Sequence, residues 1–569
     1  MPALQVVLSL GQVAAGAAIV LKCRKIVRAA QAVVRKTLGE VVVLDRVRSV
    51  SDILRSTART MPKKIAIVDE AGSLTYAAFD ADVDSFARAL RKNGVVHGDR
   101  VAYLLWNQRE LLISYFAIAR VGALTVSLNY RLTPEELAYQ LTAAGCKVMV
   151  ADEALVDLAS KAISLSNLPI LQIVAGGGAG DGPLTFAAAL HDSVEDDADF
   201  PVVSPDADSG IWFTSGTTGR PKGAVVKHRS AVAAATLTMA VSAYPENVRF
   251  LTVAPLFHRG AIENFALSIV LCGGTQYMFK RFSPALTLEY LAKYDIQVAF
   301  IVPTMAWQFL SEPTAQNLTF PHLTHWMSAS APLPPVLAER IHKQFKLPNG
   351  VTNAYGITEM LFVSSRPPSM MTKKVESVGL PIPLTQVIIY DDRRGILPNG
   401  EIGEILISGP TSFAYYLNNE QATRDAIIDL NGTSWYRSGD LGVLDEDGYL
   451  TIKDRKKDMI ISGGENIYCA EVEQVLSESP AIREVAVVGM PDEKWGEIVV
   501  AAIVTSSDEE FDLDTIARNC ATLASYKRPR EIVILEQLPR NSFGKVVKDK
   551  LRTIVREKLE TTRKQLRAS

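Results

Sequence analysis

The sequence predicts an α/β fold with a large N-terminal part and a smaller C-terminal part. From about residue 48 onward, short apolar runs alternate with amphipathic stretches, a pattern typical of strands and helices in layers with parallel sheet. A cluster of charged residues at 453–458 then interrupts this pattern. About 110 residues follow it, enough for a separate small core. We therefore expect a domain boundary at this cluster.

In the N-terminal part, strands and helices are expected to alternate. A helix should begin at Pro134, with Thr133 as its N-cap, because a threonine hydroxyl can accept a bond from the first turn. The other predicted elements are a strand at 101–105, a helix at 110–120, a strand at 124–128 and a strand at 148–150.

In the C-terminal part, the pattern predicts one helix, several strands and a basic terminal helix. The expected elements are a helix near 470–476 and strands at 485–488, 499–504 and 532–535. This order indicates a small α+β unit.

Composition narrows the functional classes. The 569 residues include 60 Lys plus Arg and 62 Asp plus Glu, so the net charge of −2 argues against a nucleic acid as partner of the whole chain. The five cysteines are scattered and form no CxxC pair, which disfavours a disulfide framework or a structural zinc site. We therefore expect a reducing compartment, the cytoplasm.

The N-terminal extension leaves several possibilities open. Residues 3–21 carry no charge and would span about 28 Å as a helix, close to the thickness of a bilayer core. Basic residues interleaved with apolar ones follow at 22–38, which is typical of a helix lying on an anionic membrane. The extension could therefore span a membrane, touch its cytoplasmic face through residues 1–45, pack on its own protein or stay disordered.

The richest motif follows a predicted buried strand at 211–213. Residues 214–223, Thr-Ser-Gly-Thr-Thr-Gly-Arg-Pro-Lys-Gly, combine hydroxyls, glycines and two cations. Glycines let backbone N–H groups approach an anion, hydroxyls donate hydrogen bonds, and cations neutralise charge. The spacing of Lys222 differs from that of a Walker A loop, and the segment predicts a polyphosphate site.

Three further segments carry groups suited to a nucleotide: 353–359, 436–440 and 539–545. Tyr355 offers an aromatic face for a purine and Glu359 a carboxylate for magnesium, although a loop-to-helix cap explains this segment equally well. Asp440 offers a carboxylate for ribose hydroxyls, although the isolated segment favours a tight turn. Lys545 precedes the last helix, where a lone lysine is usually a solvated charge.

Together and in this order, the four segments resemble the acyl-adenylate-forming superfamily, which includes acyl-CoA synthetases, aryl-CoA ligases, luciferases and peptide-synthetase adenylation domains. The resemblance covers residues 48–569. Residues 454–468 are most similar to those of medium- and long-chain fatty acyl-CoA synthetases. Cys469 stands where those enzymes usually have proline, and we expect this change to alter loop stiffness rather than chemistry.

The resemblance implies a large N-terminal adenylate-forming domain of layered sheets and helices and a small mobile α+β C-terminal domain. It implies that a carboxylate attacks the α-phosphate of ATP to give acyl-AMP and pyrophosphate, after which coenzyme A displaces AMP as a thioester. The C-terminal domain would rotate about Lys457 between the two steps. The implied parts are an extension at 1–47, an ATP- and acyl-binding domain at 48–453, a hinge at 454–458 and the domain carrying the catalytic lysine at 459–569.

The resemblance also assigns residues to roles, with ATP, Mg²⁺ and coenzyme A as cofactors and co-substrates. The implied catalytic residues are Lys545, Glu359, Thr214 and His258. The implied ATP- or AMP-binding residues are Thr214, Ser215, Gly216, Thr217, Thr218, Gly219, Lys222, Ser330, Ala331, Tyr355, Gly356, Thr358, Asp440 and Arg455. Glu359 is the implied metal ligand. The implied coenzyme A-binding residues are Ser462, Gly463 and Gly464. The implied acyl-binding residues are His258, Ile301, Ser328, Tyr355 and Gly356.

The sequence says less about which carboxylic acid is the substrate. His258 stands where amino-acid-activating relatives carry aspartate, which argues against amino acids, and small or apolar pocket walls favour a fatty acid. Glu263 is an unexplained charge that a ring-bearing polar acid could explain. The alternatives are therefore an aryl- or sterol-side-chain-CoA ligase, an acyl-AMP ligase that loads a carrier protein, and a catalytically silent acyl-binding protein on the same fold.

Overall fold

A computed structural model of the chain describes residues 47–176, 184–191, 199–214, 221–370, 372–479, 481–506, 512–540 and 546–568. The expectations for residues 1–46, for Ser215 to Gly219 and for Lys545 fall outside these ranges. No helix within the described ranges combines the length and the apolar character needed to cross a bilayer.

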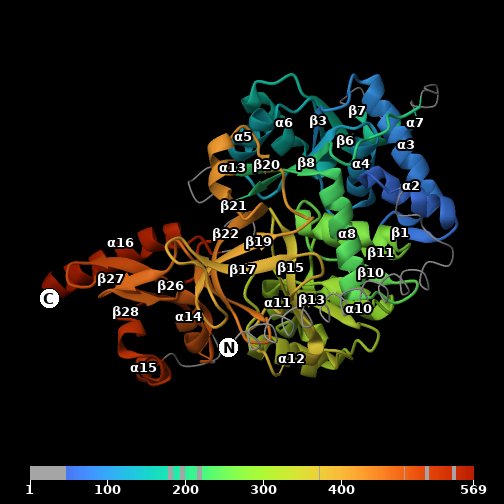
Figure 1. Cartoon of the computed structure of the whole chain (residues 1–569). Helices are drawn as coiled ribbons and strands as arrows, with labels where there is room; N and C mark the ends of the chain where they lie inside the picture. Colours follow the sequence, from blue (N-terminus) through green and yellow to red (C-terminus); the bar gives the residue numbers. More distant parts are fainter. Residues whose placement is uncertain are drawn as a thin grey trace, which may run out of the picture.

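Two large sheets form the main lobe, with helix α8 between them in Figure 1. The first sheet runs, in spatial order, β16 (Leu380–Pro381), β15 (Leu361–Arg366), β14 (Val351–Ile357), β13 (His325–Ser328), β12 (Val298–Phe300), β10 (Arg249–Thr252), β11 (Thr275–Met278), β1 (Ile65–Asp69) and β2 (Gly72–Thr75). The second runs β20 (Tyr415–Tyr416), β9 (Lys222–Lys227), β8 (Asp208–Thr214), β4 (Leu124–Ser127), β3 (Arg100–Leu104), β5 (Val148–Asp152), β6 (Leu171–Ala175) and β7 (Leu184–Thr185). The centres of both sheets are parallel.

Two smaller sheets complete the molecule. The third is antiparallel and contains β18 (Gly395–Ile396), β17 (Gln386–Asp391), β19 (Gly403–Ser408), β22 (Thr433–Leu444) and β21 (Ile427–Leu430), with β23 (Leu450–Arg455) beside β22. The fourth contains β25 (Glu465–Ile467), β24 (Ile460–Ser462), β27 (Gly496–Thr505) and β26 (Ile482–Asp492), with β28 (Glu531–Ile534) beside β27.

Helices cover the sheets, as the alternation of the sequence predicts. They are α2 (Val50–Thr60), α3 (Tyr76–Lys92), α4 (Arg109–Arg120), α5 (Pro134–Ala144), α6 (Val156–Ser166), α7 (Phe186–His191), α8 (His228–Ser242), α9 (Leu267–Leu271), α10 (Pro284–Lys293), α11 (Pro303–Leu310), α12 (Pro335–Phe345), α13 (Glu420–Ala426), α14 (Cys469–Ser477), α15 (Leu513–Asn519) and α16 (Lys548–Ala568). A π-helical turn, η3 (Gly260–Ala266), precedes α9.

The predicted order of elements is confirmed. β3, α4, β4 and β5 lie within a few residues of their predicted positions, and α14, β26, β27, β28 and α16 follow as expected in the C-terminal part. Thr133 caps α5: its hydroxyl accepts from the backbone N–H of Glu136, whose carboxylate accepts from Thr133 N.

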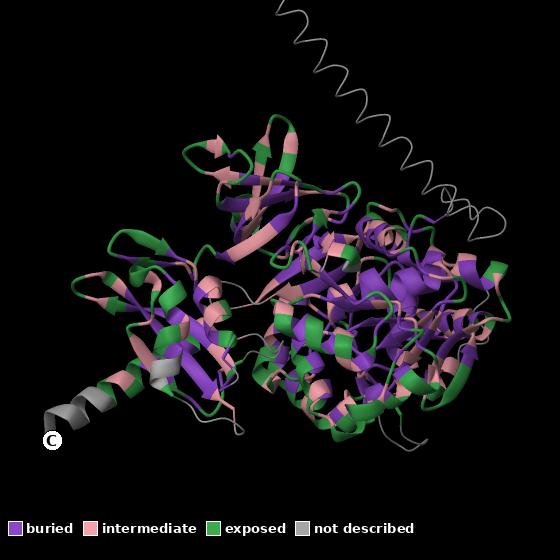
Figure 2. Ribbon diagram, turned by 90° about the horizontal axis from the view of Figure 1, so that it is seen from below, coloured by how far each residue is buried: buried purple, intermediate pink, exposed green. Residues whose placement is uncertain are grey.

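The small C-terminal domain has hydrophobic clusters of its own. One face of its sheet packs residues such as Ile467 and Val472, and the other packs Val500 against Leu551 of α16. Figure 2 shows buried segments inside the C-terminal lobe, apart from those of the main lobe. The fold is therefore α/β, with a large layered N-terminal domain and a small α+β C-terminal domain.

His228 links the main lobe to the first described helix. It begins α8, is fully buried, and its Nδ1 accepts a hydrogen bond from the backbone N–H of Val50 at 3.3 Å. Burial lowers the pKa of His228 to about 4, with Asp52 and Asp208 opposing the shift. The imidazole is therefore neutral in the folded protein at neutral pH.

Replacing His228 with asparagine should reduce the sensitivity of the protein to mild acid. Below about pH 6.5 the unfolded chain binds a proton at this histidine, whereas the folded protein binds it only near pH 4. Acidification through this window therefore stabilises the unfolded chain, by about 1.4 kcal/mol per pH unit for this one group. Between about pH 7 and about pH 5, the Tm of the wild type should fall further than that of His228→Asn, which keeps an acceptor for Val50. Equal losses would remove His228 from the acid response.

Candidate functional site at the facing carboxyl ends of two sheets

The carboxyl ends of the two large sheets meet. Asn107, shortly after β3, donates to the carbonyl of Ala254 at 3.2 Å and accepts from the N–H of Leu256 at 2.8 Å, both shortly after β10. The hydroxyl of Ser127, at the end of β4, donates to the carbonyl of Phe257 at 2.8 Å. Parallel sheets bind ligands at this edge, so the junction is the first place to look for a site.

Most of the expected site residues lie at these strand ends. Thr214 ends β8, His258 follows β10, Ile301 follows β12, Ser328 ends β13 with Ser330 and Ala331 after it, and Tyr355 and Gly356 end β14 with Thr358 and Glu359 after them. Residues up to 145 positions apart in the sequence are thus supplied by strand ends of the two large sheets.

The β8–β9 hairpin frames the predicted polyphosphate segment. Thr214 and Lys222 pair directly across the two strands, and the Thr214 hydroxyl lies 3.5 Å from the carbonyl oxygen of Lys222. The ammonium nitrogen of Lys222 lies 5.1 Å from the ring centroid of Tyr416, within cation–π range. The hairpin therefore directs Lys222 toward a residue that also contacts Glu359.

Tyr416 holds the carboxylate of Glu359. Its hydroxyl donates to Glu359 Oε1 at 2.6 Å, and the hydroxyl of Tyr436 lies 3.4 Å from that of Tyr416. Burial raises the pKa of both tyrosines, and the charge of Glu359 raises it further. Both phenols therefore stay protonated and can keep donating.

This carboxylate suits a magnesium ion that a nucleotide brings with it. Mg²⁺ is usually held by one or two carboxylates, with phosphate oxygens and waters completing its shell. No group of three or more potential metal-ligating side chains occurs among the residues that the structure describes. Glu359 fits the role of a single protein ligand to a phosphate-bound metal.

Asp440 joins two sheets through its carboxylate. It accepts from the hydroxyl of Tyr355, on β14, at 2.5 Å and from Nε of Arg455, on β23, at 2.6 Å. Burial and the charge of Asp440 raise the pKa of Tyr355, so that the phenol remains the donor. The three residues expected at the adenosine are thus in direct contact.

Two local expectations are wrong. Residues 436–440 do not form a tight turn, because they lie inside the long strand β22. Residues 353–359 do not lead into a helix cap, because β14 runs to Ile357 and a short turn leads into β15. Residues 436–440 are held by pairing with β19 and β23, and residues 353–357 by pairing with the next strand, β15.

Ser330 has a conformation unusual for its residue type. Its φ is +73°, in the left-handed region that glycine favours, and the residue is exposed beside the end of β13. Such strained residues gather at functional sites, which agrees with the nucleotide-binding role expected for this segment.

Glu263 has a partner within the protein. Its Oε2 lies 2.7 Å from Nε of Arg259, one helical turn earlier, and each side chain is 1% exposed. Burial raises the pKa of Glu263, and Arg259 opposes this shift. The charge that was unexplained in the sequence therefore needs no polar substrate to account for it.

The segments expected to act after the first reaction step lie in the C-terminal domain. Lys457 is half-exposed, with its ammonium 4.0 Å from Asp549 of α16. Ser462, Gly463 and Gly464 form the tip of the β24–β25 hairpin, where both glycines have positive φ and the ring of Trp495 lies against Gly463. Within the described residues, α16 begins at Lys548, three positions after Lys545.

Sequence reasoning missed three residues that the structure brings to this site: Tyr416, Thr411 and Arg259. Arg259 could have been found, because it and Glu263 are opposite charges four residues apart in an apolar segment, the spacing of a helical ion pair. Tyr416 and Thr411 carry no such signal.

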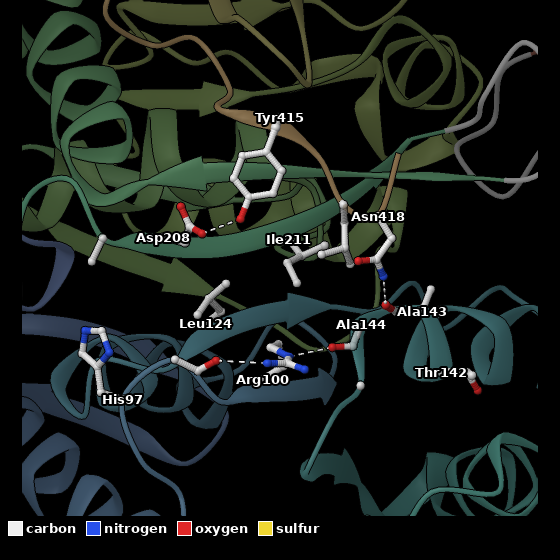
Figure 3. A pocket seen from close by; sticks show the side chains of 14 residues that line it. His97, Arg100, Leu124, Thr142, Ala143, Ala144, Asp208, Ile211, Tyr415 and Asn418 are labelled. Carbon is white, nitrogen blue, oxygen red and sulfur yellow. Dashed lines mark hydrogen bonds between the residues drawn. The ribbon is translucent and has the colours of Figure 1, made fainter. Parts of the chain in front are cut away.

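A surface pocket lies at the opposite edge of the second sheet (Figure 3). Arg100, Leu124 and Asp208, which begin β3, β4 and β8, contribute to its lining. Several of its polar groups bond the protein: Tyr415 donates to Asp208 at 2.6 Å and Arg100 donates to the carbonyl of Ala144 at 2.6 Å. The pocket is therefore distinct from the site at the carboxyl ends.

Comparison with known proteins agrees with this geometry. The profile of the AMP-binding enzyme family matches residues 54–417, and that of the AMP-binding enzyme C-terminal domain matches residues 471–545. An indoleacetate–CoA ligase from Aromatoleum aromaticum is 34% identical over 87% of this chain and 96% of its own length. The long-chain-fatty-acid–CoA ligase FadD13 from Mycobacterium tuberculosis is 32% identical over 90% and 99%.

A solved structure shares the fold as well. It is the o-succinylbenzoate coenzyme A synthetase from Bacillus subtilis in complex with ATP and magnesium ion, with a TM-score of 0.77 and 28% identity over 88% of this chain and 99% of that one. These matches span both domains and include proteins named as CoA ligases. The chain therefore belongs to the AMP-binding enzyme family and is an AMP-forming acid–thiol ligase that uses ATP, Mg²⁺ and coenzyme A.

Proposed function

We propose that the protein is an ATP-dependent fatty acyl-CoA synthetase. The fatty acid carboxylate attacks the α-phosphate of ATP, releasing pyrophosphate and forming acyl-AMP, and the thiol of coenzyme A then displaces AMP. The observation that carries the proposal is the series of contacts from Lys222 to Tyr416 and from Tyr416 to Glu359, because it gathers a cation and a metal-binding carboxylate at one point.

The first step joins two anions, so the site has to supply positive charge where negative charge accumulates. Lys222 and the hydroxyls from Thr214 to Thr218 cradle the β- and γ-phosphates, and Thr358 contacts the α-phosphate. Glu359 holds Mg²⁺, which when bound neutralises phosphate charge. Lys545 bridges the carboxylate and the α-phosphate.

The adenosine part of ATP is assigned to the other end of the site. Tyr355 stacks on adenine beside Gly356, with Ser330 and Ala331 opposite. Asp440 and Arg455 bind the ribose hydroxyls. The contact between Asp440 and Arg455 at 2.6 Å supports this assignment, because it fixes the carboxylate before the nucleotide arrives.

The domain roles follow from the same reaction. The ATP- and acyl-binding domain is placed at 48–453, the hinge at 454–458 and the mobile domain at 459–569. Rotation about Lys457 withdraws Lys545 and brings Ser462–Gly464 to the coenzyme A channel. Residues 1–45 are assigned a peripheral membrane contact on the cytoplasmic side, which suits a substrate that partitions into lipid.

The acid is assigned a hydrophobic tail. Ile301 is fully buried, and the buried carboxylate of Glu263 is paired with Arg259. His258 is assigned as a gating residue beside the carboxylate of the acid. A ring-bearing acid is the second candidate, supported by the similarity to the indoleacetate–CoA ligase and by the hydroxyl of Ser328, which is buried with no bonding partner among the described residues.

Replacing Asp440 with alanine should mainly weaken ATP binding. Hydrogen bonds to a charged group contribute about 1.5–3 kcal/mol, so the loss of the ribose contacts should raise the Kd for ATP by about 10- to 100-fold. Isothermal titration of the variant, with the exposed Glu446→Gln as control, measures this. An unchanged affinity for ATP would remove Asp440 from the nucleotide site.

Replacing Lys545 with alanine should separate the two half-reactions. Formation of acyl-AMP should fall by at least about 100-fold, because the cation that meets both anions is gone. Conversion of supplied acyl-AMP to thioester should persist, and the exposed Lys550→Ala should leave both steps intact. Equal loss of both steps in Lys545→Ala would contradict the proposed rotation.

A graded panel of carboxylic acids tests the substrate. Thioester formation that depends on ATP and coenzyme A should rise with alkyl chain length, because each buried methylene contributes about 0.8 kcal/mol to binding. A sharp optimum for cinnamate-like or other ring-bearing acids would favour the second candidate instead. Absence of pyrophosphate release with decanoate and every other acid would indicate a silent acyl-binding protein.

A further inference from the structure

The turn that carries Glu359 is strained. The chain leaves β14 at Ile357 and enters β15 at Leu361, whose φ of +53° lies in the left-handed region. Gly356 permits this closure, since a Cβ there would lie 2.1 Å from the carbonyl oxygen of Leu361. A strained turn keeps one shape only where the surrounding protein holds it.

A neighbouring segment holds two carbonyl groups of this turn. The carbonyl oxygen of Glu359 accepts from the N–H of Phe413 at 2.7 Å. The carbonyl oxygen of Met360 accepts from the hydroxyl of Thr411 at 2.6 Å. Residues 411–413 therefore act as a brace along one side of the turn.

Arg259 holds the turn and the brace at once. Its Nη1 donates to the carbonyl of Thr358 at 2.6 Å, and its Nη2 donates to the carbonyl of Thr411 at 3.2 Å. With the two bonds from the brace, three consecutive carbonyl groups of the turn are held from outside it. The guanidinium is the one group that contacts both segments in this set of bonds.

Arg259 is itself fixed. Glu263 accepts from its Nε at 2.7 Å, and the hydroxyl of Tyr115 lies 3.4 Å from the other oxygen of the same carboxylate. Both charged side chains are 1% exposed, so they have no competing water. A buried ion pair contributes little net stability compared with an apolar pair of the same size, but it fixes geometry, which makes a positioning role the better explanation.

We propose that Arg259 is a positioning residue for the nucleotide site: it holds the turn Thr358–Met360 so that Glu359 presents its carboxylate, with Tyr416 on one oxygen, to the metal-bound phosphates. The inference rests on the proposed function for the role of Glu359. It extends that function by giving Arg259 a positioning role and Glu263 the role of holding Arg259 in place.

Two variants separate geometry from charge. Arg259→Lys keeps the charge beside Glu263, but one ammonium cannot reach Glu263 and both carbonyl groups in the geometry of a planar fork. The double variant Arg259→Met, Glu263→Met removes both charges and leaves no lone buried ion. Arg120→Lys is the matched control, because Arg120 is equally buried and bonds Ser51, Asp80 and Asp84 far from the turn.

Hydrogen exchange of the nucleotide-free protein is the first measurement. In both Arg259 variants, amides in a peptide covering residues 357–363 should exchange at least about tenfold faster than in the wild type, the size expected when a charged hydrogen bond is lost. The Arg120→Lys protein should lose thermal stability yet keep wild-type exchange in this peptide. Equal exchange at 357–363 in the wild type and both Arg259 variants would overturn the inference.

Binding of ATP with and without Mg²⁺ is the second measurement. The factor by which Mg²⁺ tightens ATP binding should shrink by about tenfold in both Arg259 variants and stay unchanged in Arg120→Lys. Formation of thioester from supplied acyl-AMP should stay within about twofold of the wild type, because that step does not use the metal-bound phosphates. An unchanged Mg²⁺ factor in the Arg259 variants would contradict the positioning role.

Failure of this inference differs from failure of the proposed function. If the wild type neither binds ATP nor forms acyl-AMP with any acid, the proposed function fails, while the exchange measurement still reports whether Arg259 holds the turn. If the wild type is active and the Arg259 variants behave like Arg120→Lys, the function stands and Arg259 is only a structural ion pair.

Discussion

The carboxylate of Asp440 is the contact on which the arrangement of the site depends. It is nearly fully buried and accepts bonds from Tyr355 of the first large sheet and from Arg455 of the antiparallel sheet. Removing either partner would leave a buried carboxylate with one bond fewer, which is costly. These bonds connect the first large sheet to the antiparallel sheet. They therefore help to position the residues that follow β14 and β23.

Local pattern predicts the elements of this fold well, because each strand and helix is specified by residues close in sequence. The helix predicted at 110–120 is α4, and the strand predicted at 101–105 is β3 shifted by one residue. The N-cap at Thr133 needed only the residues of one turn. Within the first sheet, β10, β12 and β13 are parallel, so the residues that follow them lie at the same edge.

What pattern cannot predict is pairing between distant segments. Residues 436–440 resemble a turn in isolation, and pairing with β19, β21 and β23 makes them part of a long strand. Tyr416 contacts Glu359, which lies 57 residues earlier in the sequence, and Thr411 contacts Met360, which lies 51 residues earlier. No sequence motif predicts either contact. These contacts are decided by how sheets pack, and single-sequence periodicity carries no information about that.

The hinge proposed at Lys457 follows two neighbouring residues at the end of β23, Asp454 and Arg455, which bond different parts of the protein. Arg455 bonds Asp440 in the nucleotide site, whereas Asp454 accepts from the backbone N–H of Cys469 at 2.5 Å, at the start of α14 in the C-terminal domain. Proline at this position would lack that N–H, so Cys469 does more than change loop stiffness: it gives the C-terminal domain a bond across the hinge. The proposed rotation about Lys457 would break this bond and leave Asp454 with the bond that it accepts from the backbone N–H of Arg455 at 2.7 Å. The proposed rotation would therefore link the nucleotide site to the position of the C-terminal domain through adjacent residues of a single strand.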